Sequence, residues 1–203
     1  MRTFALAMKK IWILITKIGG WKFILPEKGS RPEIQRCVFA TAPHTSVADY
    51  LVGTAYLWSL GVNGRIFIKK EFFWGPLGPL LRHLGAISID RGNRKNDMVG
   101  AAVHEFAKGE GLAIAITPEG TRKPVKRWKR GFWEIAHQAQ VPIVPAFLDF
   151  GKRQISIGEA IWTTDDAEAD ILKIRRLYRK EMAKHPEQFI EVDDASAVPQ
   201  NEK

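Results

Sequence analysis

Cysteine and long apolar runs are both scarce in this sequence of 203 residues. The single Cys37 excludes an intrachain disulfide and, within the apolar stretch CVFATA, is expected to be a small buried side chain in a reducing compartment. The uncharged stretch from Ile11 to Thr16 is far shorter than the ~20 residues that a membrane-spanning helix needs. No small-residue cleavage site follows it, so we expect no secretory signal.

Two kinds of catalytic motif are missing as well. No G-x-S-x-G element occurs, which disfavours a serine hydrolase. Neither H-E-x-x-H nor a cysteine cluster is present, so no metal site is expected.

Positive charge and apolar residues, by contrast, are abundant. Lysine and arginine number 31 against 22 aspartates and glutamates, and the net charge of +9 implies an anionic partner: nucleic acid, a lipid headgroup surface or phosphorylated small molecules. With 45% hydrophobic residues the chain can bury a core, and one domain is expected. Residues 1–25 combine spaced lysines with Trp12 and Trp21, which suits an amphipathic segment in a membrane interface or, alternatively, a helix packed on its own domain.

Short β-rich runs alternate with longer helical patterns along the chain. Strands are predicted at 36–42, 64–70, 85–90, 111–117, 141–150 and 153–158. Helices are predicted at 46–60, 74–84, 95–109, 129–140 and 165–185. The alternation predicts a single-domain α/β fold over 26–190, with a mostly parallel or mixed sheet flanked by helices. Residues 191–203 are expected to form a flexible tail.

The stretch APHTSVADY places His44 after a predicted strand and five residues before Asp49. Five residues of a regular helix span about 140°, so the two side chains can meet only if His44 lies in the turn before the helix. Thr45 or Ser46 can cap that helix. Asp49 could then orient the imidazole and leave its other nitrogen free as a base, as in hydrolytic triads. The alternative is a solvated loop histidine beside a first-turn acid.

A second polar stretch, TPEGTRK, follows the apolar strand GLAIAI, where ligands bind in α/β sheets. Glu119 offers a carboxylate, Gly120 permits a sharp turn or a close backbone approach, and Arg122 can bind phosphate oxygens. An ordinary polar turn is the alternative. Lys69 and Arg91 flank predicted strands, where cations suit either anion binding or a solvated rim.

The stretch VKRWKRGFWEIA interleaves positive charges with Trp128, Phe132 and Trp133. Such a composition suits the stacking of nucleic-acid bases or a lipid–water boundary. A nonenzymatic basic protein that binds nucleic acid or an anionic membrane is therefore one hypothesis. A binder of that kind would not require His44 or Asp49.

Four stretches in this order resemble the sequence blocks of the glycerophosphate acyltransferase (lysophosphatidate acyltransferase) family. HTSVAD matches its H-x4-D block, GAISIDRG resembles the second block, PEGTR matches the third and VPIVP resembles the fourth. Each block alone is weak, but four in register over about residues 36–150 are specific. Pro43 and Thr117 stand where many members carry asparagine and phenylalanine.

The resemblance implies an α/β enzyme that moves a fatty acyl group from an acyl thioester to a lysophospholipid hydroxyl, most directly 1-acyl-glycerol-3-phosphate, giving phosphatidate. His44 would be the general base and Asp49 its orienting acid, without acyl-enzyme, metal or cofactor, and with acyl-CoA or acyl-ACP as co-substrate. Glu119, being acidic, would position Arg122 or the glycerol hydroxyl. The residues implied in acceptor binding are Lys69, Arg91, Glu119, Gly120, Thr121 and Arg122, with Lys70 as a rival to Lys69.

The expected partners are the lysophospholipid, the acyl donor and a membrane surface, with the protein peripheral or monotopic on the cytoplasmic face and no nucleic acid bound. Two alternatives use the same base: transfer to another lysolipid, such as a lyso-amino-acid lipid, and hydrolysis with water as acceptor. The other histidines are expected to be structural or exposed: His83, His104, His137 and His185.

Overall fold

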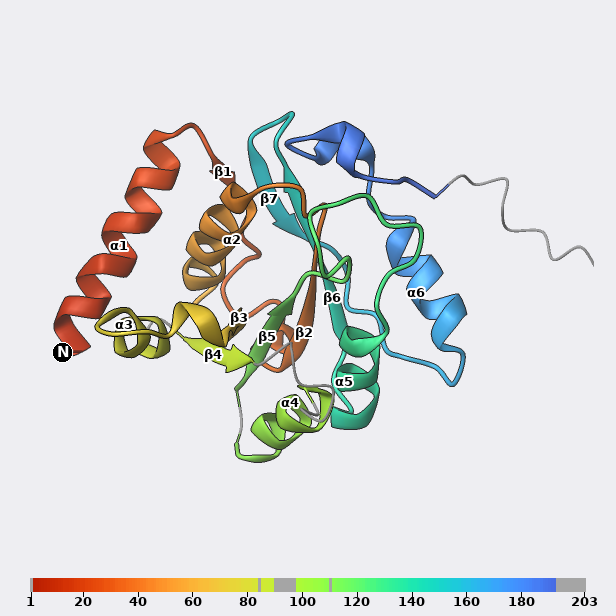
Figure 1. Cartoon of the computed structure of the whole chain (residues 1–203), viewed down its shortest axis with the longest axis horizontal. Helices are drawn as coiled ribbons and strands as arrows, with labels where there is room; N and C mark the ends of the chain where they lie inside the picture. Colours follow the sequence, from red (N-terminus) through yellow and green to blue (C-terminus); the bar gives the residue numbers. More distant parts are fainter. Residues whose placement is uncertain (1, 84, 90–97, 110, 193–203) are drawn as a thin grey trace, which may run out of the picture.

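The fold is built on one seven-stranded sheet in a computed structural model that describes residues 2–83, 85–89, 98–109 and 111–192. The strand order is β1-β7-β6-β2-β5-β3-β4 (Figure 1). Neighbouring strands run parallel except β6 and β7, which are antiparallel. The strands are β1 (Lys22–Phe23), β2 (Cys37–Ala42), β3 (Gly64–Lys69), β4 (Ala86–Ile89), β5 (Ala113–Ile116), β6 (Ile143–Asp149) and β7 (Gln154–Ile157). The predicted α/β class with a mostly parallel or mixed sheet is confirmed.

Helices cover both faces of this sheet (Figure 1). The helices are α1 (Arg2–Ile18), α2 (Val47–Ser59), α3 (Leu77–His83), α4 (Met98–Ala107), α5 (Gly131–Ala139) and α6 (Ala167–Arg175). Val38 and Ala40 of β2 belong to a core with side chains of α4, α5 and α6, whereas Phe39 belongs to a core with Leu57 of α2. A strand buried on both faces needs an apolar residue at nearly every position, which accounts for the run CVFATA.

Helix α1 lies along α2 at the outer side of the molecule (Figure 1). The Trp12 indole N–H donates to the carbonyl oxygen of Leu51 at 3.1 Å, and the Lys9 ammonium lies 5.4 Å from the centre of the Trp58 ring. Among the side chains of α1 that the structure describes, four large apolar ones are exposed: Ile11, Leu14, Ile15 and Ile18. Among the described residues, none of the helices combines the length and the apolar character needed to cross a bilayer.

The last predicted helix, over 165–185, is too long. Helix α6 ends at Arg175, and two short 3₁₀ turns follow, Lys180–Met182 and Pro186–Gln188. The carbonyl of Met182 accepts the N–H of Phe150 at 2.8 Å, beyond the end of β6. Such long-range bonds outweigh the local helix propensity of this basic stretch. Most of the predicted tail, residues 193–203, lies outside the described residues.

Candidate active site

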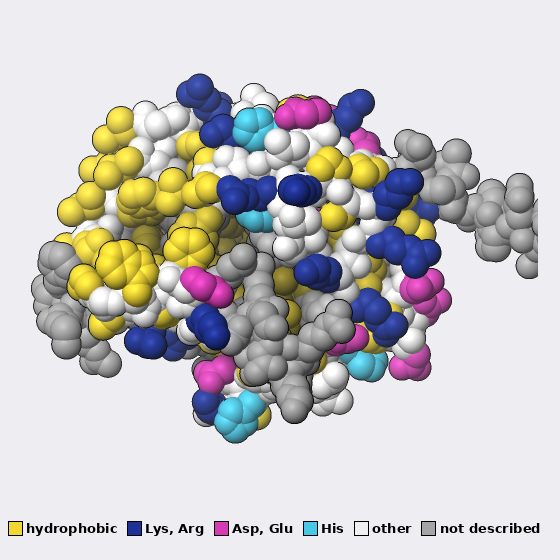
Figure 2. All heavy atoms as spheres, viewed as in Figure 1, with side chains coloured by type: hydrophobic (Ala, Val, Ile, Leu, Met, Phe, Trp, Pro, Cys, Tyr) yellow, Lys and Arg dark blue, Asp and Glu magenta, His cyan; other side chains and the backbone are white. Residues whose placement is uncertain are grey.

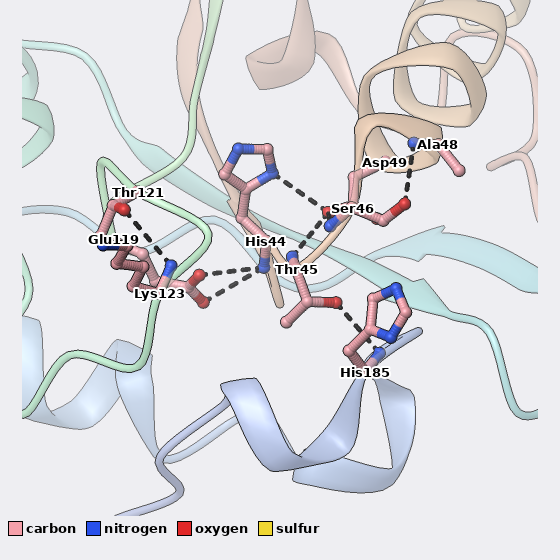
Figure 3. A network of polar contacts seen from close by, with 9 residues as sticks. All are labelled: His44, Thr45, Ser46, Ala48, Asp49, Glu119, Thr121, Lys123 and His185. Atoms are coloured by element: carbon pink, nitrogen blue, oxygen red, sulfur yellow. Dashed lines mark hydrogen bonds and ion pairs between the residues drawn. The ribbon is translucent and has the colours of Figure 1, made fainter.

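His44 lies in the turn between β2 and α2, immediately after the cis peptide bond between Ala42 and Pro43. Helix α2 begins one residue after its N-cap, Ser46. His44 therefore precedes the helix, and its ring turns back over the first turn toward Asp49 (Figure 3). The sequence spacing required this arrangement for the two side chains to meet.

One oxygen of Asp49 holds the turn together. Asp49 Oδ2 accepts a hydrogen bond from His44 Nδ1 at 3.1 Å and from the backbone N–H groups of Thr45 and Ser46 at 2.7 Å each. Because a carboxylate only accepts hydrogen bonds, this contact places the imidazole hydrogen on Nδ1 and leaves the lone pair on Nε2. The ring is thus oriented to take a proton through Nε2.

Glu119 supports the same histidine from the opposite side. Its side chain is 3% exposed, and its two oxygens accept the backbone N–H of His44 at 3.0 and 3.2 Å (Figure 3). Burial raises the pKa of this carboxyl to about 7, an effect that the hydrogen bond from His44 and the nearby charge of Arg175 partly offset. The expectation from the family resemblance, that Glu119 positions Arg122 or the glycerol hydroxyl, remains a prediction.

The loop that carries Glu119 turns sharply at Gly120. Gly120 has a φ of +66°, in the left-handed region that glycine tolerates, and its N–H donates to the carbonyl of Thr117 at 3.0 Å. The N–H of Lys129 donates to the carbonyl of Pro118 at 2.9 Å, and the Lys129 side chain crosses the face of Gly120 where a Cβ would stand. The turn therefore brings a lysine side chain against the loop.

An apolar cavity of about 440 Å³ opens beside His44 and Asp49. It runs between α2, where Gly53 and Leu57 line it, and the sheet, where Ile116 is one of several apolar lining residues. Lys129 is a basic residue in this lining. An imidazole beside an apolar cavity, with a lysine in the same lining, can accommodate a ligand that has an apolar part and an anionic part.

The structure describes only some of the residues implied in acceptor binding. Gly120 lines the cavity, Arg122 is exposed, and the half-buried Thr121 accepts the N–H of Lys123 at 3.2 Å through its Oγ1. Lys69 ends β3, but its side chain is outside the description, and Arg91 falls outside the described residues altogether. The two motifs HTSVAD and PEGTR meet through the backbone of His44 and the side chain of Glu119.

Three residues near the site were not singled out from the sequence. Lys129 stands in the quoted stretch VKRWKRGFWEIA, so its basic and aromatic composition is the available signal. Arg175 of α6 is buried and donates to the carbonyls of Val125 and Lys126 in the loop after PEGTR. Gln188 lies against Thr45. No sequence motif could have identified Arg175 or Gln188, because both bind backbone atoms.

Basic side chains gather over the loop that follows PEGTR and the start of α5 (Figure 2). The exposed members are Arg122, Lys123, Lys126, Arg127, Lys129 and Arg130. Apolar side chains gather instead on the other side of the same view, over α1 and its neighbours (Figure 2). The face is thus divided between a basic and an apolar region.

Several known proteins are similar to this chain. A protein of Cocos nucifera named 1-acyl-sn-glycerol-3-phosphate acyltransferase is 33% identical over 112 residues, which cover 52% of this chain and 35% of the relative. A protein of the same name from Limnanthes douglasii is 32% identical over 64% of this chain and 49% of its own length. The human 1-acyl-sn-glycerol-3-phosphate acyltransferase beta is 29% identical over 75% of this chain and 60% of its own length. The chain spans about half the length of the curated relatives that it matches.

The fold also resembles a solved structure. The crystal structure of the 1-acyl-sn-glycerophosphate (LPA) acyltransferase PlsC from Thermotoga maritima matches with a TM-score of 0.63 at 16% identity, covering 87% of this chain and 77% of that one. At this identity the match supports the fold alone. A sequence model of the family described as Acyltransferase matches residues 27–149, which is more than half of the chain. With the four sequence blocks and the His44–Asp49 turn in place, the chain belongs to the acyltransferase family.

Proposed function

We propose that this protein is an O-acyltransferase that moves a fatty acyl group from an acyl thioester to the free hydroxyl of 1-acyl-glycerol-3-phosphate, giving phosphatidate. The observation that carries the proposal is the His44–Asp49 pair at an apolar cavity of about 440 Å³. The names of the relatives from Cocos nucifera and Limnanthes douglasii support the same acceptor.

The reaction needs one base and no second nucleophile. His44 Nε2 removes the proton from the acceptor hydroxyl, and the oxygen attacks the thioester carbonyl carbon. The C–S bond then breaks, the new C–O ester bond remains, and the imidazolium returns its proton to the leaving thiolate. Asp49, hydrogen-bonded to Nδ1, stabilises the imidazolium while the proton is held.

Cations around the cavity would bind the acceptor phosphate. Lys129 lines the cavity, and the side chains of Lys69, Arg91 and Arg122 remain candidates from their place in the sequence. Glu119 would act on the acceptor indirectly, because its oxygens are engaged by the backbone of His44. Gly120 and Thr121 would let the loop backbone approach the headgroup.

The donor would be acyl-CoA or acyl-ACP, with no cofactor or metal taking part. The basic residues of 122–130 are complementary to both carriers, since a nucleotide brings phosphates and a carrier protein brings acidic side chains. A donor of either kind would insert its acyl chain into the apolar cavity and leave its carrier over this basic region.

The protein would work peripherally on the cytoplasmic face of a membrane, without binding nucleic acid. The exposed apolar side chains of α1, together with Phe72 and Trp74, support this attachment, and lysines such as Lys10 and Lys17 would face anionic headgroups. Acceptor and product are both lipids, so a cavity beside such a surface shortens their path.

The experiment that tests the proposal is product identification by mass spectrometry. Purified protein is incubated with acyl-CoA or acyl-ACP and a panel of lysolipids that includes a lyso-amino-acid lipid. We expect phosphatidate from 1-acyl-glycerol-3-phosphate and none from His44→Ala. Transfer to a different lysolipid would keep the chemistry and replace the acceptor, whereas free fatty acid alone would indicate a hydrolase. Full activity of His44→Ala would overturn the mechanism.

A further inference from the structure

A segment near the end of the described chain joins the two loops of the site. Oriented with its nitrogen toward them, the side-chain amide of Gln188 donates to the carbonyl of Thr45 at 3.2 Å and to the carbonyl of Arg122 at 2.9 Å. Thr45 follows His44, and Arg122 ends the PEGTR motif. Gln188 lies outside the region 27–149 that matches the acyltransferase family model.

The segment itself is well anchored. The N–H of His185 donates to Thr45 Oγ1 at 3.2 Å, a contact drawn in Figure 3. Phe189, next to Gln188, is 6% exposed and belongs to the core beneath α5 and α6. The carbonyl of Ile190 accepts a hydrogen bond from Arg175 at 2.9 Å. Gln188 is therefore held at both sides by contacts that do not involve its amide.

Arg175 anchors the loop after PEGTR as well. Its guanidinium donates to Val125 and Lys126 as well as to Ile190, so one buried side chain fixes the segment and the loop after PEGTR together. Backbone carbonyls of two active-site loops thus have fixed donors on one C-terminal segment.

We infer that Gln188 is a positioning residue, which sets the distance between the base on one loop and the acceptor-binding loop on the other. The inference rests on the proposed function for its kinetic consequences. A side-chain amide carries two N–H donors, and the two carbonyls use both. Because a displacement of about 1 Å between reacting groups can lower a rate about 100-fold, a bridge between these loops affects both acceptor binding and proton transfer.

The decisive variant is Gln188→Glu, which keeps the shape of the side chain but turns oxygen atoms toward two carbonyl oxygens. We expect kcat/KM for the acceptor to fall about tenfold or more, with a higher acceptor KM, a lower kcat and an unchanged donor KM. Gln188→Ala is expected to show a smaller loss of the same kind. Gln138→Ala, at an exposed glutamine of α5, is the matched control and retains wild-type kinetics.

A second measurement does not depend on activity. In hydrogen exchange followed by mass spectrometry, peptides over 43–49 and 118–124 should exchange faster in Gln188→Glu, while the α5 peptide 131–139 is unchanged. Unchanged exchange in both loops would overturn the inference even if the wild type transfers no acyl group. In an active enzyme, wild-type acceptor kinetics in Gln188→Glu would also overturn the inference. The same holds for a loss of kcat that is fully explained by a lower melting temperature of the variant. If the proposed function is wrong but the inference is right, the wild type will be inactive, and the two loops will still exchange faster in Gln188→Glu.

Discussion

Glu119 and His44 are joined through the main chain, because both oxygens of the Glu119 carboxyl accept the same His44 amide N–H. The side chain of His44 is fixed separately by Asp49. His44 is therefore held at two points, one contact acting on its backbone and one on its ring. Glu119 is almost fully buried, so the ionisation of its carboxyl is linked to the stability of the fold.

The stability of the protein should depend on pH through Glu119. Burial raises the pKa of this carboxyl from 4.5 to about 7, so between these values the folded chain holds a proton that the unfolded chain has released. The free energy of unfolding therefore falls as pH rises through this window. Glu119→Gln removes the titration, and its stability relative to wild type should rise by about 1 to 3 kcal/mol from pH 5 to pH 8.

Urea unfolding at both pH values measures this difference, with Glu27→Gln at an exposed glutamate as control. The side chains of His44, Asp49, Arg175 and Tyr178 interact with Glu119, and they are the same in both proteins. A difference between Glu119→Gln and wild type that stays constant with pH would contradict the linkage.

Two variants separate helix capping from catalysis at the start of α2. Ser46→Ala removes the hydroxyl that accepts the N–H of Ala48, which costs about 1 kcal/mol of stability, but it leaves the contact between His44 and Asp49. Asp49→Asn removes the charge beside the imidazole and should lower kcat on the order of 10² to 10⁴-fold. Urea unfolding and kcat measured on both variants test this. Equal losses of kcat in the two variants would mean that Asp49 acts only as a cap.

Much of the fold, and the contact between His44 and Asp49, follow from local sequence patterns. Apolar strands alternating with helices predict the layered α/β class, and the spacing from His44 to Asp49 limits their contact to one turn geometry. The bond from Glu119 to the backbone of His44 joins positions 75 residues apart, and a main-chain N–H is common to almost all residues. No pattern in the sequence marks such a partner.

Bonds to backbone atoms also explain why the C-terminal residues of the site could not be predicted from the sequence. Arg175 and Gln188 bind backbone carbonyls, and they lie in a stretch whose charges and apolar spacing predict one long helix. The structure ends α6 at Arg175 because residues beyond it bury Phe189 and bond to Phe150, just after β6, and to Thr45. Tertiary contacts of this kind outweigh helix propensity, and they become visible only when the chain is folded.

Attachment to membranes should depend on the exposed face of α1. Leu14 and Ile18 are 57% and 77% exposed, and transferring such side chains into lipid contributes about 1.5 to 3 kcal/mol each when burial is complete. The double variant Leu14→Ser/Ile18→Ser should therefore bind anionic vesicles at least about tenfold more weakly in a sedimentation assay. Its activity on a short-chain, water-soluble acceptor should be unchanged.

The matched control is Trp162→Ser, at a side chain that is 62% exposed but does not belong to α1. It should sediment with vesicles as the wild type does. Equal binding by all three proteins would show that α1 is not the attachment surface.

The position of Lys129 should depend on the absence of a side chain at Gly120. A Cβ on Gly120 would lie 2.7 Å from Lys129 Cε, so Gly120→Ala must displace the lysine as well as strain a backbone at φ +66°. We expect a stability loss of about 1 to 2 kcal/mol and a severalfold higher acceptor KM. Gly29→Ala is the control, because Gly29 has a similar φ of +81° and, in the part of the chain that the structure describes, no atom lies within 4 Å of the added Cβ. If both variants raise the acceptor KM alike, Lys129 does not bind the acceptor.

The length of the transferred chain should respond to the size of residue 53. Gly53 lies on α2 and lines the cavity, and an added Cβ there meets no atom of the described residues within 4 Å. Gly53→Leu fills this space, so the preference for a long acyl donor over one shorter by two methylenes should fall by at least about tenfold. The same change favours the helix by about 0.8 kcal/mol, which separates a narrowed cavity from a damaged fold.

Competition between two acyl donors, read by mass spectrometry of the product, measures this preference. Gly53→Ala provides the graded control, since alanine favours the helix at least as much as leucine does while adding a single methyl group to the cavity. Its chain-length profile should lie between those of the wild type and Gly53→Leu. An unchanged profile in Gly53→Leu, with a melting temperature at or above that of the wild type, would mean that the acyl chain lies outside this cavity. His44 would then have to act on a donor bound elsewhere.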